Sequence, residues 1–93
     1  MKEEHIPYEK TIFVCTNAAE GKHCGNDGKG EKIFRALRNL AKERNLHPRF
    51  RVTQATCLGQ CALGVNIMVY PENIWHNNVT IEDVPALAER YLR

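Results

Sequence analysis

The sequence predicts one α/β domain spanning residues 1–93, in which a strand–helix–strand unit is followed by two strands and a last helix. Short β-branched and aromatic runs alternate with two longer segments of helical periodicity, and turn-forming residues separate them. A chain of 93 residues, 43% of them hydrophobic, can form one small core and does not have a disordered composition. We therefore expect a mixed four-stranded sheet with two main helices.

The first strand is expected at residues 11–15, after a polar segment over residues 1–9. Its sequence, TIFVC, is rich in the β-branched and aromatic residues that favour buried strands. Residues 16–30 contain four of the six glycines of the chain, which predicts a loop. A helix should begin between Asp27 and Gly30.

The first helix is expected over residues 31–45, and Pro48 prevents its continuation. Its apolar residues recur at i, i+1, i+4, i+7 and i+8, so they share one face. They are Ile33, Phe34, Leu37, Leu40 and Ala41. Residues 49–53 then alternate polar and apolar side chains, as in a strand with one face in water.

The second half of the chain predicts a loop over residues 57–64 and then two strands, at 67–70 and 74–76, joined by a turn. The last helix is expected to start at Thr80. There, Asp83 nearly completes a capping box.

This last helix has an apolar stripe at its expected buried face. The stripe comprises Val84, Leu87, Ala88 and Tyr91, and Val79 is placed to form a hydrophobic staple with Val84. Pro85 would lie in the second turn of a helix that starts at Thr80. At that position it should cost the helix a hydrogen bond.

The four cysteines form two spaced pairs: Cys15 with Cys24, and Cys57 with Cys61. Four thiolates are enough to complete one metal or iron–sulfur site. A strand–helix–strand unit with parallel strands brings the carboxyl ends of both strands to one edge of the sheet. Because Cys15 ends the first strand and Cys57 follows the second, the two cysteine loops should meet at that edge.

Spacing alone leaves the bound group open. An iron–sulfur cluster suits soft thiolate ligands on glycine-containing loops. Structural zinc is the alternative, and the C-x3-C pair has typical zinc spacing whereas the C-x8-C pair is long for it. Disulfides, or a dithiol that cycles between Cys57 and Cys61, are further alternatives.

Several segments together resemble one protein family over about residues 10–92. They are Cys15-Thr16-Asn17, Cys24-Gly25-x-x-Gly28, Cys57-Leu58-Gly59-x-Cys61, Val69-Tyr70-Pro71-Glu72, Trp75 and Glu82-Asp83-Val84-Pro85. The set resembles the thioredoxin-like 2Fe–2S ferredoxins. It is also similar to the small 2Fe–2S subunit of respiratory complex I and of some hydrogenases.

The resemblance implies a thioredoxin-like fold, one 2Fe–2S cluster per chain and a homodimer. It also implies that the cluster ligands are Cys15, Cys24, Cys57 and Cys61. The chain departs from the family pattern in two places. The loop between the first two cysteines is short and lacks a proline-rich insert, and Val65 stands where a proline often occurs.

Other residues have mainly solvated or structural interpretations. His23 could ligate a metal as in Rieske centres, but four cysteines already fill the site. The remaining histidines, His5, His47 and His76, are expected in solvent. Trp75 is expected in core or dimer packing rather than at the cluster. A basic patch of Lys22, Lys29 and Lys32 could dock an acidic partner or remain solvated.

The resulting prediction is an electron carrier and not an enzyme: a ferredoxin that transfers one electron between redox enzymes. The alternatives are a structural zinc-binding interaction module, or a cluster-bearing accessory subunit of a larger dehydrogenase or hydrogenase. The formal charge of +2 falls to near neutrality once a cluster of about −2 is added, so nucleic-acid binding is not expected. The sequence contains no signal-peptide pattern and no membrane span, so a cytoplasmic protein is predicted.

Overall fold

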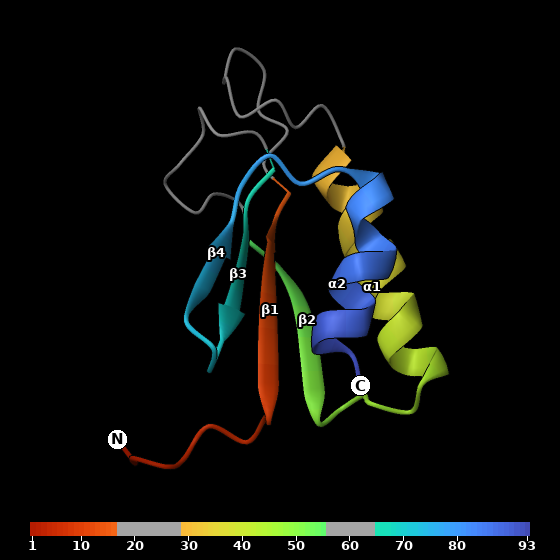
Figure 1. Ribbon diagram of the computed structural model, residues 1–93. Coiled ribbons are helices and arrows are strands. Elements are labelled where there is room, and N and C mark those ends of the chain that lie inside the picture. The colour runs from red at the N-terminus through yellow and green to blue at the C-terminus, as the bar shows by residue number, and fades with distance from the viewer. Residues whose placement is uncertain (17–28, 56–64) are drawn as a thin grey trace.

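A computed structural model describes residues 1–16, 29–55 and 65–93, and within them one sheet carries two helices on the same face (Figure 1). The sheet has the strand order β2-β1-β3-β4. The strands are β1 (Lys10–Cys15), β2 (Phe50–Ala55), β3 (Ile67–Tyr70) and β4 (Ile74–His76). The pairing of β1 is parallel with β2 and antiparallel with β3, so the predicted mixed four-stranded sheet is confirmed.

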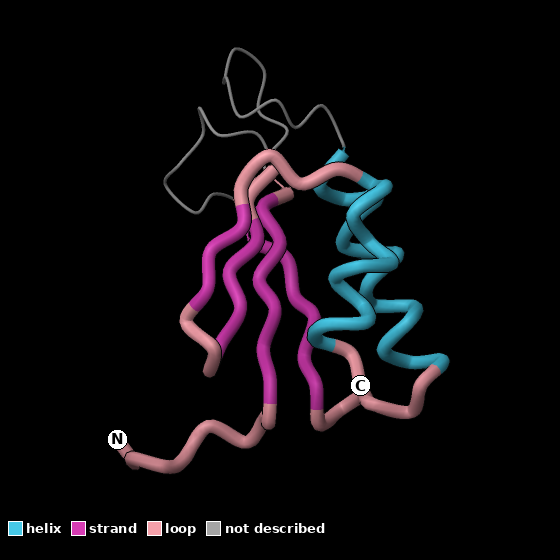
Figure 2. The backbone as a smooth tube through the Cα atoms, in the orientation of Figure 1, coloured by secondary structure: helices cyan, strands magenta, loops and turns pink. Residues whose placement is uncertain are grey.

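One face of this sheet forms the core with the helices. Alternation along β1 sends Ile12 and Val14 to that face, where Val52, Ile67 and Val69 from neighbouring strands join them. The tube view shows both helices stacked on this side, with no helix of the described residues on the other (Figure 2). The opposite face is therefore open in the described part of the chain.

Helix α1 (Lys29–Glu43) begins two residues earlier and ends two residues earlier than expected. It ends because Asn45 adopts a left-handed conformation, with φ of 58°. The N–H of Asn45 then donates to Lys42 O, and the N–H of Leu46 donates to Ala41 O. This pair of bonds is a Schellman motif, which stops the helix before Pro48 can clash with it.

The last helix begins later than its expected start at Thr80. Thr80 precedes a short 3-10 helix, η2 (Ile81–Asp83), and only then does α2 (Val84–Tyr91) start. The Asp83 carboxylate accepts a hydrogen bond of 2.8 Å from the N–H of Thr80, as the capping box requires. Pro85 therefore lies in the first turn of α2, where its missing N–H costs no hydrogen bond. The expected penalty at Pro85 was wrong.

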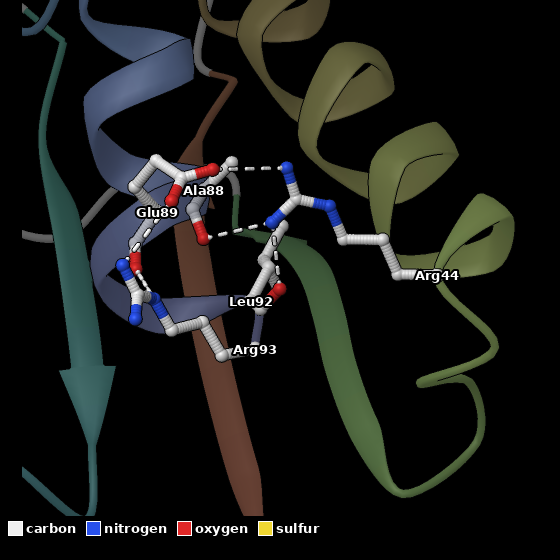
Figure 3. A network of polar contacts seen from close by, with 5 residues as sticks. All are labelled: Arg44, Ala88, Glu89, Leu92 and Arg93. Atoms are coloured by element: carbon white, nitrogen blue, oxygen red, sulfur yellow. Dashed lines mark hydrogen bonds and ion pairs between the residues drawn. The ribbon is translucent and has the colours of Figure 1, made fainter.

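The apolar stripes of both helices are confirmed. Four of the five stripe residues of α1 are buried and Leu40 is partly buried, while all four of α2 are buried. Arg44, just after α1, also reaches across to the end of α2 (Figure 3). Its guanidinium donates to the carbonyl oxygens of Ala88 at 3.2 Å and Leu92 at 2.8 Å. The two helices are thus joined by packing and by hydrogen bonds.

Candidate metal centre

Cys15 is the last residue of β1, at the edge where the parallel strands β1 and β2 have their carboxyl ends (Figure 1). Cys15 is 1% exposed, and its backbone pairs in register with that of Ala55 on β2. The N–H of Cys15 donates to Asn66 O at 2.9 Å, and the N–H of Thr16 donates to Ala55 O at 2.8 Å. Backbone hydrogen bonds on both sides therefore hold the end of β1.

The other three predicted ligands lie outside the described residues: Cys24, Cys57 and Cys61. The expected convergence of the two cysteine loops is therefore described only at Cys15. Within residues 1–16, 29–55 and 65–93, no three side chains of the His, Cys, Asp and Glu types gather as a metal site would require.

The segments that contain those cysteines leave and rejoin the described structure near Cys15. Ala55, opposite Cys15, is two residues before Cys57 in the sequence, and Val65 is four residues after Cys61. Lys29 starts α1 five residues after Cys24. Lys29 and Val65 line one hollow of about 530 Å³.

The chemistry of this edge fits a thiolate-bound group. A buried cysteine stands at the carboxyl edge of a parallel strand pair, where α/β folds place their sites. The backbone around it is already hydrogen-bonded, so the thiol is presented from a rigid strand end rather than from a loose terminus.

Asn66 is a further feature of this edge, and none of the expectations from the sequence includes it. It is 1% exposed, and its Oδ1 accepts a hydrogen bond of 3.1 Å from Nε1 of Trp75. A single polar residue between Val65 and the apolar strand that begins at Ile67 is the signal that could have found it. Trp75 is 38% exposed and lies outside the core, so of its two expected roles core packing was wrong and dimer packing stays a prediction.

Two of the three lysines of the expected basic patch lie within the described residues. Lys29 and Lys32 are at the start of α1 and line the hollow described above, whereas Lys22 and His23 lie outside the described residues.

His76 was expected in solvent, but the structure places it in a partly buried position. Its Nε2 lies 2.7 Å from the hydroxyl oxygen of Tyr91, and burial followed by the charge of Arg90 lowers the pKa of His76 below its usual 6.5.

The open face of the sheet carries apolar side chains beside the candidate centre. Phe13, Met68 and Trp75 form one row across β1, β3 and β4, since the register pairs Phe13 with Met68 and Met68 with Trp75. Tyr70 lies in the next row and is 49% exposed. A shallow apolar hollow of about 450 Å³ crosses this face, and Tyr8 of the N-terminal segment also lines it.

No helix in the described ranges combines the length and the apolar content that a bilayer crossing requires. No protein-family profile matches the chain.

Individual proteins of known family are similar to the chain over most of its length. It is 32% identical to a 2Fe–2S ferredoxin of Clostridium pasteurianum over 85 residues, which cover 87% of this chain and 82% of that protein. It is 26% identical to a 2Fe–2S ferredoxin of Aquifex aeolicus over 88 residues, covering 90% of this chain and 79% of that protein.

Solved structures agree with these relatives in fold. A structure of a thioredoxin-like 2Fe–2S ferredoxin from Aquifex aeolicus superposes with a TM-score of 0.79 at 26% identity, over 92% of this chain and 82% of that one. The wild-type crystal structure of such a ferredoxin from the same organism gives a TM-score of 0.76 at 26% identity, over 91% and 86% of the two chains. The thioredoxin-like fold expected from the sequence is confirmed.

Proposed function

The chain belongs to the thioredoxin-like 2Fe–2S ferredoxin family, and from this premise we propose that it is a one-electron carrier that holds one 2Fe–2S cluster. The observation that carries the proposal is the buried Cys15 at the carboxyl edge of the parallel β1–β2 pair. When bound, the cluster supplies a site that takes up and releases one electron. The chain supplies the ligands, their orientation and shielding from water.

The proposed ligands are Cys15, Cys24, Cys57 and Cys61. Covalent geometry supports this set, because a chain spans at most about 3.6 Å per residue. Cys57 can be no farther than about 7 Å from the Cα of Ala55, which pairs with Cys15. Cys61 and Cys24 are limited to about 14 Å from Val65 and about 18 Å from Lys29, so all three can reach the same edge.

Ligand filling also explains why this is a carrier and not an enzyme. A 2Fe–2S cluster would need four thiolates in all, and the four cysteines of the chain would supply them. No coordination position is then left for a substrate. Electron transfer needs only that a partner approach the cluster closely.

Iron and acid-labile sulfide analysis of the purified protein tests the proposal. We expect about two irons and two sulfides per chain, together with an electron paramagnetic resonance signal on reduction. Colourless protein with one tightly bound zinc would instead support the zinc-binding interaction module.

Single cysteine-to-serine variants test the ligand set. Cys15→Ser should lose most of the cluster, because a hydroxyl is a poorer ligand for iron than a thiolate. Ala55→Ser is the matched control, since it places a new hydroxyl at the paired position of β2 without removing a thiol. A Cys15→Ser protein with the full iron content and visible spectrum of the wild type would remove Cys15 from the set.

We also propose that the 93 residues form one domain of a cytoplasmic homodimer whose electron donor and acceptor are redox enzymes. Patterned cysteines remain reduced in the cytosol, which supports that location. The apolar open face of the sheet supports self-association. Sedimentation analysis should give a dimer for the wild type and a monomer for Phe13→Glu. A monomeric wild type would contradict the proposed homodimer but not the proposed electron-transfer function.

A further inference from the structure

Two hydrogen bonds connect the backbone of Cys15 to a side chain on β4. The N–H of Cys15 donates to the backbone carbonyl of Asn66 at 2.9 Å. The indole Nε1–H of Trp75 donates to the side-chain Oδ1 of the same Asn66 at 3.1 Å. Asn66 therefore contacts the end of β1 with its main chain and β4 with its side chain.

The position of Asn66 is unusual for its residue type. It is 1% exposed, and Thr11 is the only other buried polar residue among those that the structure describes. Burying an amide costs free energy unless its polar atoms are hydrogen-bonded. No buried side-chain nitrogen or oxygen in the described part of the chain lacks a partner. The cost at Asn66 is thus offset by a satisfied network.

Strand pairing alone does not require this network. The β3–β4 register is already set by the pairs of Ile67, Met68 and Val69 with residues of β4. An apolar residue at position 66 would avoid the cost of desolvating an amide. A buried polar network in which every group is hydrogen-bonded instead favours one local geometry. A single geometry is most useful next to a side chain whose direction must be fixed, such as a metal ligand.

We propose that Asn66 is a positioning residue for the ligand Cys15, and that Trp75 holds Asn66 in place. This inference rests on the proposed function, because it assigns the network a role toward the bound cluster. Groups that orient metal ligands tune the electronic properties of the metal as well as its retention. The Trp75 bond restrains the residue whose carbonyl fixes the backbone of Cys15, and so restrains the direction of the thiolate.

The test compares two aromatic substitutions on the same face of the sheet. Trp75→Phe keeps an aromatic ring but removes the indole donor to Asn66. Tyr70→Phe is the matched control, because it also removes one polar hydrogen from an exposed aromatic residue on the open face, one row away. Asn66→Ala, alone and combined with Trp75→Phe, completes a double-mutant cycle.

The readouts are the visible circular dichroism of the oxidised protein, the electron paramagnetic resonance spectrum of the reduced protein and the rate of iron loss to a chelator. Trp75→Phe should change both spectra and speed iron loss roughly fivefold, the factor that corresponds to one ordinary hydrogen bond. Tyr70→Phe should match the wild type in all three. The double variant should differ no more than the larger single variant, because both substitutions break one network.

Trp75→Phe with wild-type spectra and wild-type iron loss would overturn the proposal, even if its urea midpoint falls, because the network would then serve the fold alone. Equal changes in Trp75→Phe and Tyr70→Phe would overturn it too. If Asn66→Ala does not fold, the comparison of these two variants decides the question. Failure of the proposed function is distinguishable, since it would appear as absence of iron and sulfide in the wild type.

Discussion

The Nζ of Lys10 at the start of β1 lies 2.6 Å from Oε2 of Glu72, in the turn between β3 and β4. Both side chains are partly shielded, with 16% and 30% of their surface exposed. The ammonium group also lies over the rings of Phe50 and Tyr91, at 5.5 and 5.4 Å from their centroids. This ion pair therefore links β1, β2, the turn between β3 and β4, and α2 at the end of the sheet opposite Cys15.

Glu72→Gln should destabilise the protein at neutral pH but not in acid. Burial opposes ionisation of Glu72, yet the hydrogen bond from Lys10, a backbone hydrogen bond and the charges of Lys10 and Arg90 together lower the pKa below 4.5. The carboxylate thus contributes stability above pH 4.5, and this contribution is lost as the pH falls through the lowered pKa. We expect a loss of about 1 kcal/mol at pH 7 from urea unfolding.

The control for this prediction is Glu9→Gln. Glu9 pairs with Arg49 at 3.5 Å, and each side chain is 59% exposed, so little change is expected. An equal loss for Glu72→Gln at pH 7 and at pH 3 would show that the charge is not responsible.

His76 should make the protein less stable as the pH falls below 6.5. Because burial lowers its pKa in the folded state, the unfolded chain binds a proton more readily than the folded chain. Stability should therefore fall from pH 6.5 until the folded-state pKa is passed. His76→Phe should remove this component of the decline between pH 7 and pH 5, with a loss of about 1 kcal/mol at pH 7 from the missing Tyr91 bond.

Equilibrium unfolding at the two pH values measures both effects. His5→Gln is the control, because His5 lies in the exposed N-terminal segment and should leave the decline intact. A His76→Phe protein that loses as much stability in acid as the wild type would exclude His76 as the source.

Arg44→Lys should weaken the connection between α1 and α2. The guanidinium donates to two carbonyl oxygens at the end of α2 and approaches the carboxylate of Glu89 at 3.5 Å (Figure 3). A lysine cannot reproduce this forked geometry. We expect a loss of about 1 kcal/mol by thermal or urea unfolding. Arg93→Lys should have little effect, since Arg93 follows α2 and its hydrogen bonds within the described residues go to Glu89, four residues earlier.

Leu37→Ala should be among the most damaging single changes in α1. Leu37 is 1% exposed and belongs to the core between the helices and the sheet. Truncation of such a residue removes buried apolar surface and leaves a cavity, at a cost of about 2–5 kcal/mol. Leu40→Ala, at the partly buried edge of the same stripe, should cost about 1 kcal/mol. Equal losses for the two variants would contradict the assignment of the core.

Local sequence patterns specify some features of this protein, whereas contacts between distant segments specify others. The strands at 67–70 and 74–76 were predicted with their observed bounds, because local β-propensity and a turn between them delimit both. His76 was misjudged because its environment depends on Tyr91, fifteen residues later. Asn66 was missed because its partners, Cys15 and Trp75, lie on different strands.

The sequence by itself determined the order of strands and helices, the apolar face of each helix and the cysteine pattern typical of the family, since all three are properties of neighbouring residues. Only the tertiary structure decided where α2 begins, which sheet face stays open and what surrounds Asn66 and His76. These features arise from contacts between segments distant in the sequence. Their free energies depend on burial and on hydrogen-bond partners that no local pattern encodes.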